Sequence, residues 1–419
     1  RDVTQTTETD VLVVGAGPAG MLAALVLARQ GIKTQIFDEE WRTTGRSYAL
    51  ALHPSTLALL AELGLDRDLV SHGQRVERIG SHVGHRREHR LELSQLGGDF
   101  PFVLVLPQQA LEDALEAELE KTGVNVHWSH RVDDLVLGSE GCRATIDKLS
   151  KQSGGYGVAA SNWLVEKSFG IQARYVVGTD GYRSTVRRAL GGEFPEVQPA
   201  DVFAVFEYAS AGEPRHDMTL VVDDAKTSVL WPLPNERHRW SFQIDDDAFQ
   251  ERRRKSRLAM QVGAESYPHL TPEYLRELVR ERAPWYEAPI GNLAWSVEVR
   301  FERRLTTTFG GGHAYLAGDA GHMAAPVGVQ SMNAGLAEAH TLATRLGGVI
   351  HRTASYATLD AYAAEQLSTW KQLLASPNLP KVGEDAPPWA KEHARRLLGA
   401  IPASGNELAT LLGKLGLSL

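Results

Sequence analysis

The sequence predicts an α/β fold in which a parallel sheet with covering helices is joined to a separate antiparallel sheet and to C-terminal helices. The first observation is a short apolar run, Val11–Val14, which is followed at once by a glycine-rich turn and a long apolar helix pattern. The second is a change of period: between Asp201 and Ile244, apolar and polar residues alternate in successive stretches, which is typical of antiparallel strands. The third is a series of helix patterns from Tyr356 to the C-terminus.

The opening unit is a strand, a turn and a helix. Its strand is β-branched and apolar, as a strand buried on both faces should be. The turn has the pattern G-x-G-x-x-G and consists of Gly15, Ala16, Gly17, Pro18, Ala19 and Gly20. The three glycines fit a tight turn, the close approach of a phosphate and the close packing of helix on strand. A second apolar run then ends at Asp38, next to Glu39, where a ribose hydroxyl needs an acceptor. These features together predict a Rossmann-like dinucleotide-binding unit.

Composition excludes several classes of protein. The chain has 419 residues and a net charge of −8, so no basic excess exists to neutralise the phosphates of a nucleic acid. Its one cysteine, Cys142, cannot build a disulfide framework, a cysteine-based zinc site or an iron–sulfur cluster. No apolar run reaches the ~18 residues that would predict a membrane span, and the polar start does not look like a signal peptide. We expect a cytoplasmic protein, because a lone thiol fits a reducing compartment.

Four histidines lie in or near a segment of alternating polarity between Val76 and Leu93. They are His72, His82, His85 and His89. Because no carboxylate or cysteine completes a coordination set, we interpret the segment as a solvated hairpin and predict no metal site.

Two later segments have the same pattern of a buried strand followed by a turn of small residues. The first runs from Gly178 through Asp180 and Gly181 to Arg187, and the second from Gly318 and Asp319 to Asn333. Helix capping is the simple structural interpretation of the two aspartates, and it is compatible with cofactor binding.

The three motifs, in this order, resemble those of the single-component FAD-dependent aromatic hydroxylases, the group A flavoprotein monooxygenases with the p-hydroxybenzoate hydroxylase fold. The resemblance covers residues 8–370. It implies a discontinuous FAD-binding domain made of residues 1–70, 100–195 and 300–375. It also implies an antiparallel-sheet substrate domain, residues 71–99 and 196–299, and a helical C-terminal segment, residues 376–419.

The resemblance further implies roles for individual residues. The first turn would hold the FAD pyrophosphate, and Asp38 the adenosine ribose. Other positions would follow the cofactor along its length: Arg46 and Gln108 at the pyrophosphate and ribityl chain, Val132 under the adenine, Asp180 and Gly181 at the flavin and the nicotinamide, and Asp319 at the ribityl chain. Pro326 would lie beside the reacting edge of the flavin. The backbone of Gly328, Val329, Gln330, Ser331, Met332 and Asn333 would face the ring, with a helix beginning near Asn333.

The implied activity is hydroxylation of an aromatic or polyketide-like small molecule through a flavin C4a-hydroperoxide, with O₂ and either NADH or NADPH. There is no second strand–Gly-x-Gly–helix unit, so the nicotinamide would bind transiently. We expect a monomer or homodimer. Candidate walls of the substrate pocket are Tyr208, His216, Trp231, Trp240 and Gln243, although core packing explains each equally well. The sequence identifies no catalytic base.

Val329 and Ser331 stand where the family usually has glycine, which allows close approach of the backbone to the ring. This departure keeps a flavin-dependent oxidase or reductase open as an alternative. A halogenase ranks lower, because the chain lacks Trp-x-Trp-x-Ile-Pro. A flavin-binding scaffold without catalysis is the alternative from a different class.

Overall fold

The computed structural model describes residues 6–41, 49–151, 163–212, 215–223, 226–247, 270–324 and 327–419. Two residues with predicted roles, Arg46 and Pro326, lie outside these ranges.

The first sheet is mainly parallel and has eight strands in the order β17-β18-β11-β1-β2-β8, with β10 paired to β11 and β9 paired to β10. Its strands are β1 (Thr6–Val14), β2 (Thr34–Phe37), β8 (Val126–His127), β9 (His130–Leu137), β10 (Cys142–Lys151), β11 (Trp163–Gly178), β17 (Gly310–Gly311) and β18 (Ala314–Leu316). Alternate residues of β1 enter different core clusters, Val11 and Val13 on one face and Leu12 and Val14 on the other. Both faces of β1 are therefore buried, as its continuous apolar run predicts.

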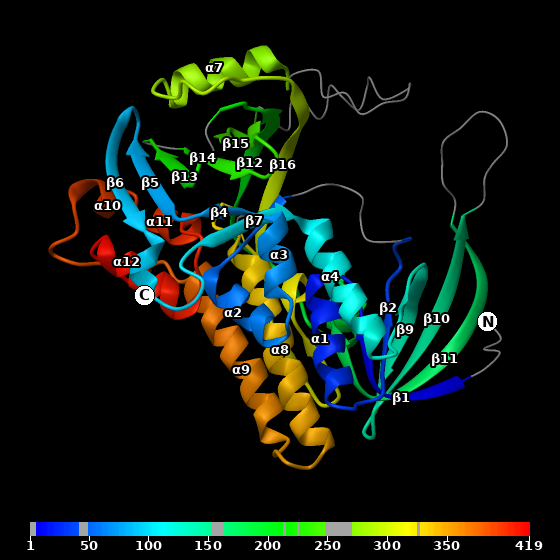
Figure 1. Ribbon diagram of the computed structural model, residues 1–419. Coiled ribbons are helices and arrows are strands. Elements are labelled where there is room, and N and C mark those ends of the chain that lie inside the picture. Colours follow the sequence, from blue (N-terminus) through cyan, green and yellow to red (C-terminus); the bar gives the residue numbers. More distant parts are fainter. Residues whose placement is uncertain are drawn as a thin grey trace.

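Helices cover this sheet (Figure 1). They are α1 (Pro18–Arg29), α4 (Gln108–Lys121), α5 (Thr185–Ala189), α8 (Gln330–Ile350) and α9 (Ala357–Trp370), with the short turns η2 (Gly318–Ala320) and η3 (Lys371–Ala375). The helices α1, α4 and α8 share one core cluster with Val11 and Val13. The helix α8 begins at Gln330, three residues before the predicted start at Asn333, because Val329 takes a left-handed conformation and ends the preceding loop.

The second sheet also has eight strands, in the order β19-β16-β12-β15-β14-β13-β5-β6. They are β5 (Arg78–Val83), β6 (Arg86–Glu92), β12 (Glu196–Ala209), β13 (Asp217–Val222), β14 (Thr227–Leu233), β15 (Arg237–Ile244), β16 (Leu293–Leu305) and β19 (His322–Met323). All neighbours pair antiparallel except β13 and β5. The predicted α/β fold with an antiparallel sheet is thus confirmed.

Different elements cover the two faces of this second sheet (Figure 1). The helix α7 (Pro272–Arg282) packs on one face, in a cluster with Phe206 and Trp240. The other face packs against the C-terminal helices α10 (Pro388–Glu392), α11 (Ala394–Ala400) and α12 (Gly405–Lys414). This C-terminal segment therefore belongs to the core of the molecule.

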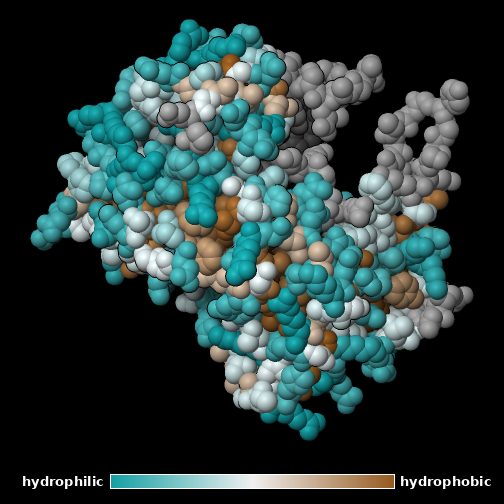
Figure 2. Space-filling model, viewed as in Figure 1, coloured by the Kyte–Doolittle hydropathy of each residue, from teal (hydrophilic) through white to brown (hydrophobic). Residues whose placement is uncertain are grey.

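A small sheet connects the two large ones. It consists of β3 (Ala49–Leu52), β7 (Val103–Pro107) and β4 (Gln74–Val76), flanked by α2 (Pro54–Glu62) and α3 (Asp66–His72). The remaining short elements are η1 (Leu93–Leu96), β20 (Lys381–Val382) and β21 (Leu417–Ser418). The face seen in Figure 2 is largely hydrophilic, with apolar residues near its centre and in smaller patches elsewhere.

The histidine-rich segment forms the predicted β5–β6 hairpin, but His82 is not solvated. Its ring is buried and stacks on Trp285 at 4.0 Å. The reason is that β5 lies inside the sheet, between β13 and β6. Within the ranges that the structure describes, no helix combines the length and the hydropathy that crossing a bilayer demands.

Candidate functional site

The three glycine-rich turns leave adjacent strands at one edge of the parallel sheet. The strands β1, β11 and β18 end at Val14, Gly178 and Leu316, and Gly178 is the register partner of both of the others. Ligands of α/β proteins bind outside the carboxyl ends of such strands. Turns that are 300 residues apart in the sequence therefore face the same space.

The first and second turns are in direct backbone contact. Gly15 has a φ of +96°, and a Cβ there would lie 2.4 Å from the Thr179 carbonyl oxygen. The Thr179 hydroxyl donates hydrogen bonds to the carbonyl oxygens of Val14 (3.0 Å) and Gly15 (2.9 Å). A Cβ at Gly20 would lie only 1.9 Å from the Gly15 carbonyl oxygen. Glycine at 15 and 20 is thus required by the packing of the protein itself.

The third turn packs against both of the others. A Cβ at Gly335 would lie 2.9 Å from the Gly318 Cα, so α8 touches the turn with no space for a side chain. A Cβ at Gly318 would lie 3.4 Å from the Ala19 Cβ of α1. The buried Arg187 donates a hydrogen bond of 2.7 Å to the Ala320 carbonyl oxygen and one of 2.6 Å to the Tyr182 carbonyl oxygen. These contacts hold the three turns together as one site.

Gly17 differs from its neighbours because the space beside it is open. No heavy atom lies within 4 Å of where its Cβ would be. Gly17 is also the N-cap of α1, and no side chain accepts hydrogen bonds from the first turn of that helix. Free N–H groups at the positive end of a helix dipole attract a phosphate. This cradle fits the pyrophosphate of a dinucleotide.

The residues predicted at the adenosine end lie around the end of β2. Asp38 accepts hydrogen bonds from the backbone N–H groups of Ala16 (2.6 Å) and Glu40 (2.8 Å), which brings its carboxylate to the first turn. Glu39 is exposed beside it. Val132 is buried in the same core cluster as Phe37, beneath the surface of the site.

Gln108 begins α4 and donates a hydrogen bond of 2.7 Å to Glu112. The other carboxylate oxygen of the buried Glu112 has no partner in the described ranges. Burial raises the pKa of Glu112. A buried carboxyl oxygen without a hydrogen-bond partner destabilises the folded protein, so this position fits a hydrogen-bond donor from a ligand.

Asp180 caps a helix. Its carboxylate accepts hydrogen bonds from the Ser184 hydroxyl (2.5 Å) and the backbone N–H groups of Thr185 (2.7 Å) and Val186 (3.3 Å), at the start of α5. Burial raises the pKa of Asp180, and these hydrogen bonds oppose the rise. Gly181 follows with a φ of +71°. The capping interpretation of Asp180 is therefore correct, and the turn after it remains part of the site.

Asp319 is not a helix cap. Its side chain is open to solvent although protein surrounds it, and desolvation raises its pKa. An accessible carboxylate is available to a ligand. The Ser331 hydroxyl donates a hydrogen bond of 3.4 Å to Oδ1 of Asp319.

A buried polar network supports this corner. His322 lies 2.8 Å from the Ser331 hydroxyl through Nδ1 and 3.0 Å from Glu338 through Nε2. Glu338 also accepts hydrogen bonds from the Gly318 N–H (2.8 Å) and the Trp370 indole N–H (2.6 Å). The Trp370 ring stacks on His322 at 3.8 Å. Glu338 and Trp370 were not among the residues predicted from the sequence, although an acid between apolar residues of α8 is a signal of a buried role.

The start of α8 offers backbone rather than side chains to a ligand. Val329 has φ 51° and ψ 32°, a left-handed conformation that is rare for a β-branched residue. The Gln330 side chain donates hydrogen bonds to the carbonyl oxygens of Leu398 (2.7 Å) and Ile401 (3.1 Å). The Asn333 side chain is fully buried between β3 and α2, where it accepts from the His53 N–H (2.8 Å). Met332 packs against the main core cluster.

The C-terminal segment holds this loop in place through His53, a residue that the sequence motifs did not indicate. His53 is fully buried, with Nε2 2.8 Å from the Gly328 carbonyl oxygen and Nδ1 3.1 Å from the Ser404 hydroxyl. Burial lowers the pKa of His53 to about 4, so the ring is neutral at pH 7. The Gly328 N–H donates to the Gly399 carbonyl oxygen at 3.1 Å.

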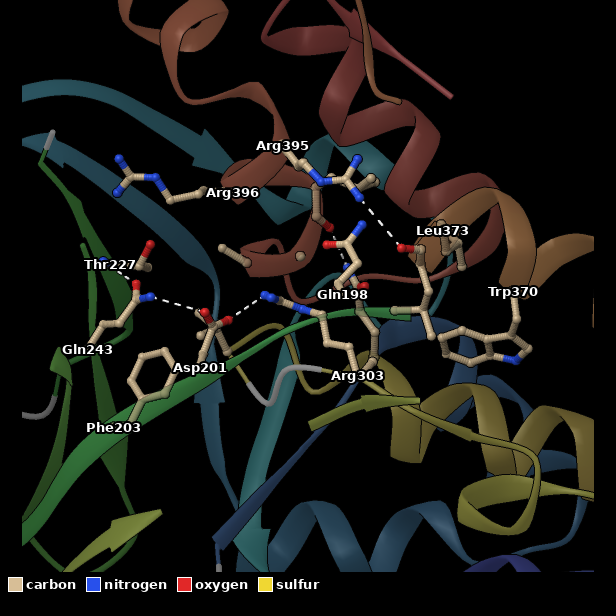
Figure 3. A pocket seen from close by; sticks show the side chains of 17 residues that line it. Gln198, Asp201, Phe203, Thr227, Gln243, Arg303, Trp370, Leu373, Arg395 and Arg396 are labelled. Carbon is tan, nitrogen blue, oxygen red and sulfur yellow. Dashed lines mark hydrogen bonds and ion pairs between the residues drawn. The ribbon is translucent and has the colours of Figure 1, made fainter. Parts of the chain in front are cut away.

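A cavity of about 220 Å³ lies between the antiparallel sheet, the third turn and the C-terminal segment (Figure 3). Its lining includes Asp201, Phe203, Gln243 and Arg303 from the sheet, Ala324 and Val327 from the third turn, and Leu373, Arg395 and Leu398 from the C-terminal part. The cavity is therefore next to the loop that was predicted to face a flavin ring.

The predicted wall residues fall into two groups. Gln243 lines the cavity, and Trp231 lies in the core cluster on the same face of the sheet. Tyr208 and Trp240 lie in the cluster under α7, on the opposite face, where the Tyr208 hydroxyl lies 2.6 Å from the Tyr286 hydroxyl. His216 precedes β13 and is not among the residues that line the cavity. Alternate residues of a strand point to opposite faces of the sheet, and this alternation separates the two groups. The sequence did not reveal which face meets the cavity.

Known proteins are similar to this chain in sequence and in fold. A family model described as FAD binding domain matches residues 8–376. The chain is 27% identical over 370 residues to 6-methylpretetramide 4-monooxygenase of Streptomyces rimosus, covering 87% of this chain and 60% of that protein. It is 25% identical over 381 residues to pentachlorophenol 4-monooxygenase of Sphingobium chlorophenolicum, covering 88% of this chain and 64% of that protein. The chain thus spans less than two thirds of the length of these two curated relatives.

The crystal structure of p-nitrophenol 4-monooxygenase from Pseudomonas putida superposes with a TM-score of 0.69 and 20% identity, covering 98% of this chain and 97% of that chain. At this identity the likeness concerns the fold. The match to the family model extends over most of the chain, and the open cradle at Gly17 and the accessible Asp319 fit its cofactor. This chain therefore belongs to the FAD binding domain family, and its cofactor is FAD.

Proposed function

We propose that this protein is an FAD-dependent monooxygenase that uses NADH or NADPH and O₂ to hydroxylate an aromatic or polyketide-like small molecule. The observation that carries the proposal is the convergence of three distant turns on one open space, with a cavity beside the third turn. Two curated relatives are monooxygenases by name, one of them of pentachlorophenol. A cytoplasmic monomer or homodimer completes the proposal, and the buried free thiol of Cys142 fits a reducing compartment.

In this proposal the chain holds FAD along the edge of the parallel sheet. The first turn and the start of α1 bind the pyrophosphate, Asp38 and Glu39 the ribose, and Gln108 and Asp319 the ribityl region. The turn at Asp180 and Gly181 and the backbone from Gly328 to Asn333 line the ring. When bound, FAD supplies the acceptance of hydride from the nicotinamide and the activation of O₂.

The start of α8 would set the electrostatics at the ring. No side chain caps this helix, and the side chains of Gln330 and Asn333 are bonded elsewhere in the protein. The N–H groups of the first turn are therefore available. They carry the positive end of the helix dipole and favour negative charge on a reduced ring placed there.

A labelled-oxygen experiment tests the activity. The holoprotein is supplied with ¹⁸O₂, NADH or NADPH, and a panel of phenols and hydroxybenzoic acids. We expect one ¹⁸O atom in each product molecule and consumption of the nicotinamide that is stimulated by the substrate. Oxidised product without ¹⁸O would favour the oxidase alternative, which is suggested by Val329 and Ser331 in the loop proposed to face the ring. Nicotinamide consumption that no ligand changes would favour a scaffold.

A substitution tests the placement of the cofactor. Asp319→Ala should release the flavin and leave a colourless but folded protein, because the accessible carboxylate makes few contacts with the protein. The matched control Asp319→Asn keeps the shape and should retain part of the flavin. Visible absorbance measures the flavin content, and circular dichroism measures folding. An Asp319→Ala protein that stays fully yellow would contradict the assignment.

A further inference from the structure

The cavity beside the third turn contains more positive charge than negative. Arg303 forms an ion pair with Asp201, which also accepts a hydrogen bond of 3.1 Å from Gln243 (Figure 3). Arg395 lies on the other side of the cavity, on α11. The hydrogen-bond partners found for its guanidinium in the described ranges are the carbonyl oxygens of residues 376 (2.7 Å), 379 (3.3 Å) and 374 (3.5 Å).

Carbonyl oxygens satisfy N–H groups but do not neutralise a charge. The pKa of Arg395 is lowered, first by burial and then by the positive charge of Arg303, so the two guanidinium groups act on each other. Arg396 adds a third positive group at the rim, although its guanidinium is bonded to the carbonyl oxygens of Asp223 and Lys226. Among the described residues that line the cavity, Asp201 is the one carboxylate, and it interacts with Arg303 and Arg396. Arg303 and Arg396 are partly buried and Arg395 is exposed, so the excess of positive charge lies at the open side of the cavity. Such a local excess of positive charge attracts an anion.

The remaining walls suit an aromatic ring. Phe203 rises from the sheet, Trp370 and Leu373 come from the end of α9 and from η3, and Val327 closes the side next to the third turn. Guanidinium groups match the planar fork of a carboxylate better than an ammonium group does. The cavity therefore combines apolar walls with a fixed planar cation.

We propose that the substrate is an anionic aromatic compound whose carboxylate, or a comparable acidic group, binds between Arg395 of the C-terminal segment and Arg303 of the antiparallel sheet. The aromatic part of this inference rests on the proposed function, whereas the anion site is testable by binding alone. The same segment touches the flavin-facing loop, because Gly399 accepts the hydrogen bond of the Gly328 N–H. The C-terminal segment would then both recognise the charge of the substrate and position the loop beside the ring.

Isothermal titration of the FAD-loaded protein tests the proposal with matched pairs of probes: benzoate against benzamide, and 4-hydroxybenzoate against 4-hydroxybenzamide. We expect each acid to bind at least about tenfold more tightly than its amide, because a hydrogen bond to a charged group contributes more than a neutral one. The preference should shrink as salt is added, since screening weakens the attraction. This part of the test needs no variant.

Three variants locate the site. Arg395→Gln keeps hydrogen-bond donors for the nearby carbonyl oxygens but removes the charge, and it should abolish the preference for acids while affinity for the amides stays within about twofold. Arg395→Lys keeps the charge and should retain most of the preference. Arg276→Gln, on the exposed surface of α7, is the remote control and should change nothing. Flavin content and the thermal midpoint check that each variant is folded.

Acids and amides that bind equally, or acids that do not bind, would overturn the proposal. So would an Arg395→Gln protein that is folded and keeps the full preference. These outcomes can be distinguished from a failure of the proposed function. If acids bind as expected but no product contains ¹⁸O, the proposed anion site is supported and the proposed hydroxylation is contradicted. If a neutral phenol gives labelled product with a KM that Arg395→Gln does not alter, the proposed hydroxylation is supported and the proposed anion site is contradicted.

Discussion

The first and third turns of the site are both shaped to accept a ligand, but different features of the chain determine their shapes. Between Gly15 and Gly20 the shape depends on missing side chains: two glycines are required by backbone contacts within the unit and with Thr179, and the third leaves open space. Between Gly318 and Asn333 the shape depends on side chains from distant parts of the chain, among them His53 and Trp370. The turn proposed to hold the phosphates is therefore encoded locally, whereas the turn proposed to face the ring is assembled by tertiary contacts.

The largest effect should come from closing the first turn. Gly20→Val places a side chain 1.9 Å from the Gly15 carbonyl oxygen, and we expect a loss of stability of about 3 kcal/mol or more. Chemical denaturation and soluble yield measure it. The control is Gly17→Ala, whose methyl group meets no protein atom. It should fold normally but bind FAD more weakly, and a Gly17→Ala protein with unchanged FAD affinity would contradict the phosphate cradle.

The third turn should be destabilised by removing an acceptor from its buried polar network. Glu338→Ala leaves the indole N–H of Trp370, the backbone N–H of Gly318 and the His322 ring without their acceptor in a buried place, at a cost of about 3 kcal/mol. Glu338→Gln keeps the shape and one acceptor, so it should cost less. Denaturant unfolding of both variants gives the comparison. Equal stability of Glu338→Ala and the unaltered protein would show that the network does not hold the turn.

The contact between the third turn and the C-terminal segment should make stability depend on pH. The pKa of His53 is about 4 in the folded protein against 6.5 for an exposed histidine. As the pH falls from 6.5 to 4, the unfolded chain takes up a proton that the folded form does not, so stability falls, by up to about 3 kcal/mol.

His53→Gln can keep both hydrogen bonds without titrating, and it should flatten this part of the curve of unfolding free energy against pH. The pKa values of His82 and His238 are also lowered to about 4, so a part of the slope should remain. Replacing the exposed His72 by glutamine is the control and should leave the slope unchanged. An unaltered slope in His53→Gln would place the pH dependence elsewhere.

The smallest effect should come from Val329. Val329→Gly removes the left-handed strain of a β-branched residue, about 1–2 kcal/mol, and adds the chain entropy of glycine, about 0.5–1 kcal/mol, so the net change should be a gain of at most about 1.5 kcal/mol. The flavin absorbance spectrum should shift as the loop relaxes toward the ring. Val327→Gly, two residues earlier in the buried core, should instead cost about 2 kcal/mol. Equal destabilisation by both changes would mean that residue 329 is not strained.

Several features of this protein could be predicted from its sequence, because they depend on local periodicity and on glycine. The structure contains the α/β class, the first turn with its two flanking strands, and the alternating strands after Asp201. Each of these features depends on residues that lie within about one helix or one hairpin of each other in the sequence, where backbone geometry allows few conformations.

Only the tertiary structure decided which residues meet. It brought Gly178 between Val14 and Leu316, buried His53 and Glu338 next to the third turn, and turned Tyr208 and Trp240 away from the cavity while Gln243 lines it. It also carried Arg395, from near the end of the chain, to the cavity wall. Such meetings depend on which face of a sheet another segment covers, and a strand pattern specifies that a face is buried without specifying the partner that buries it.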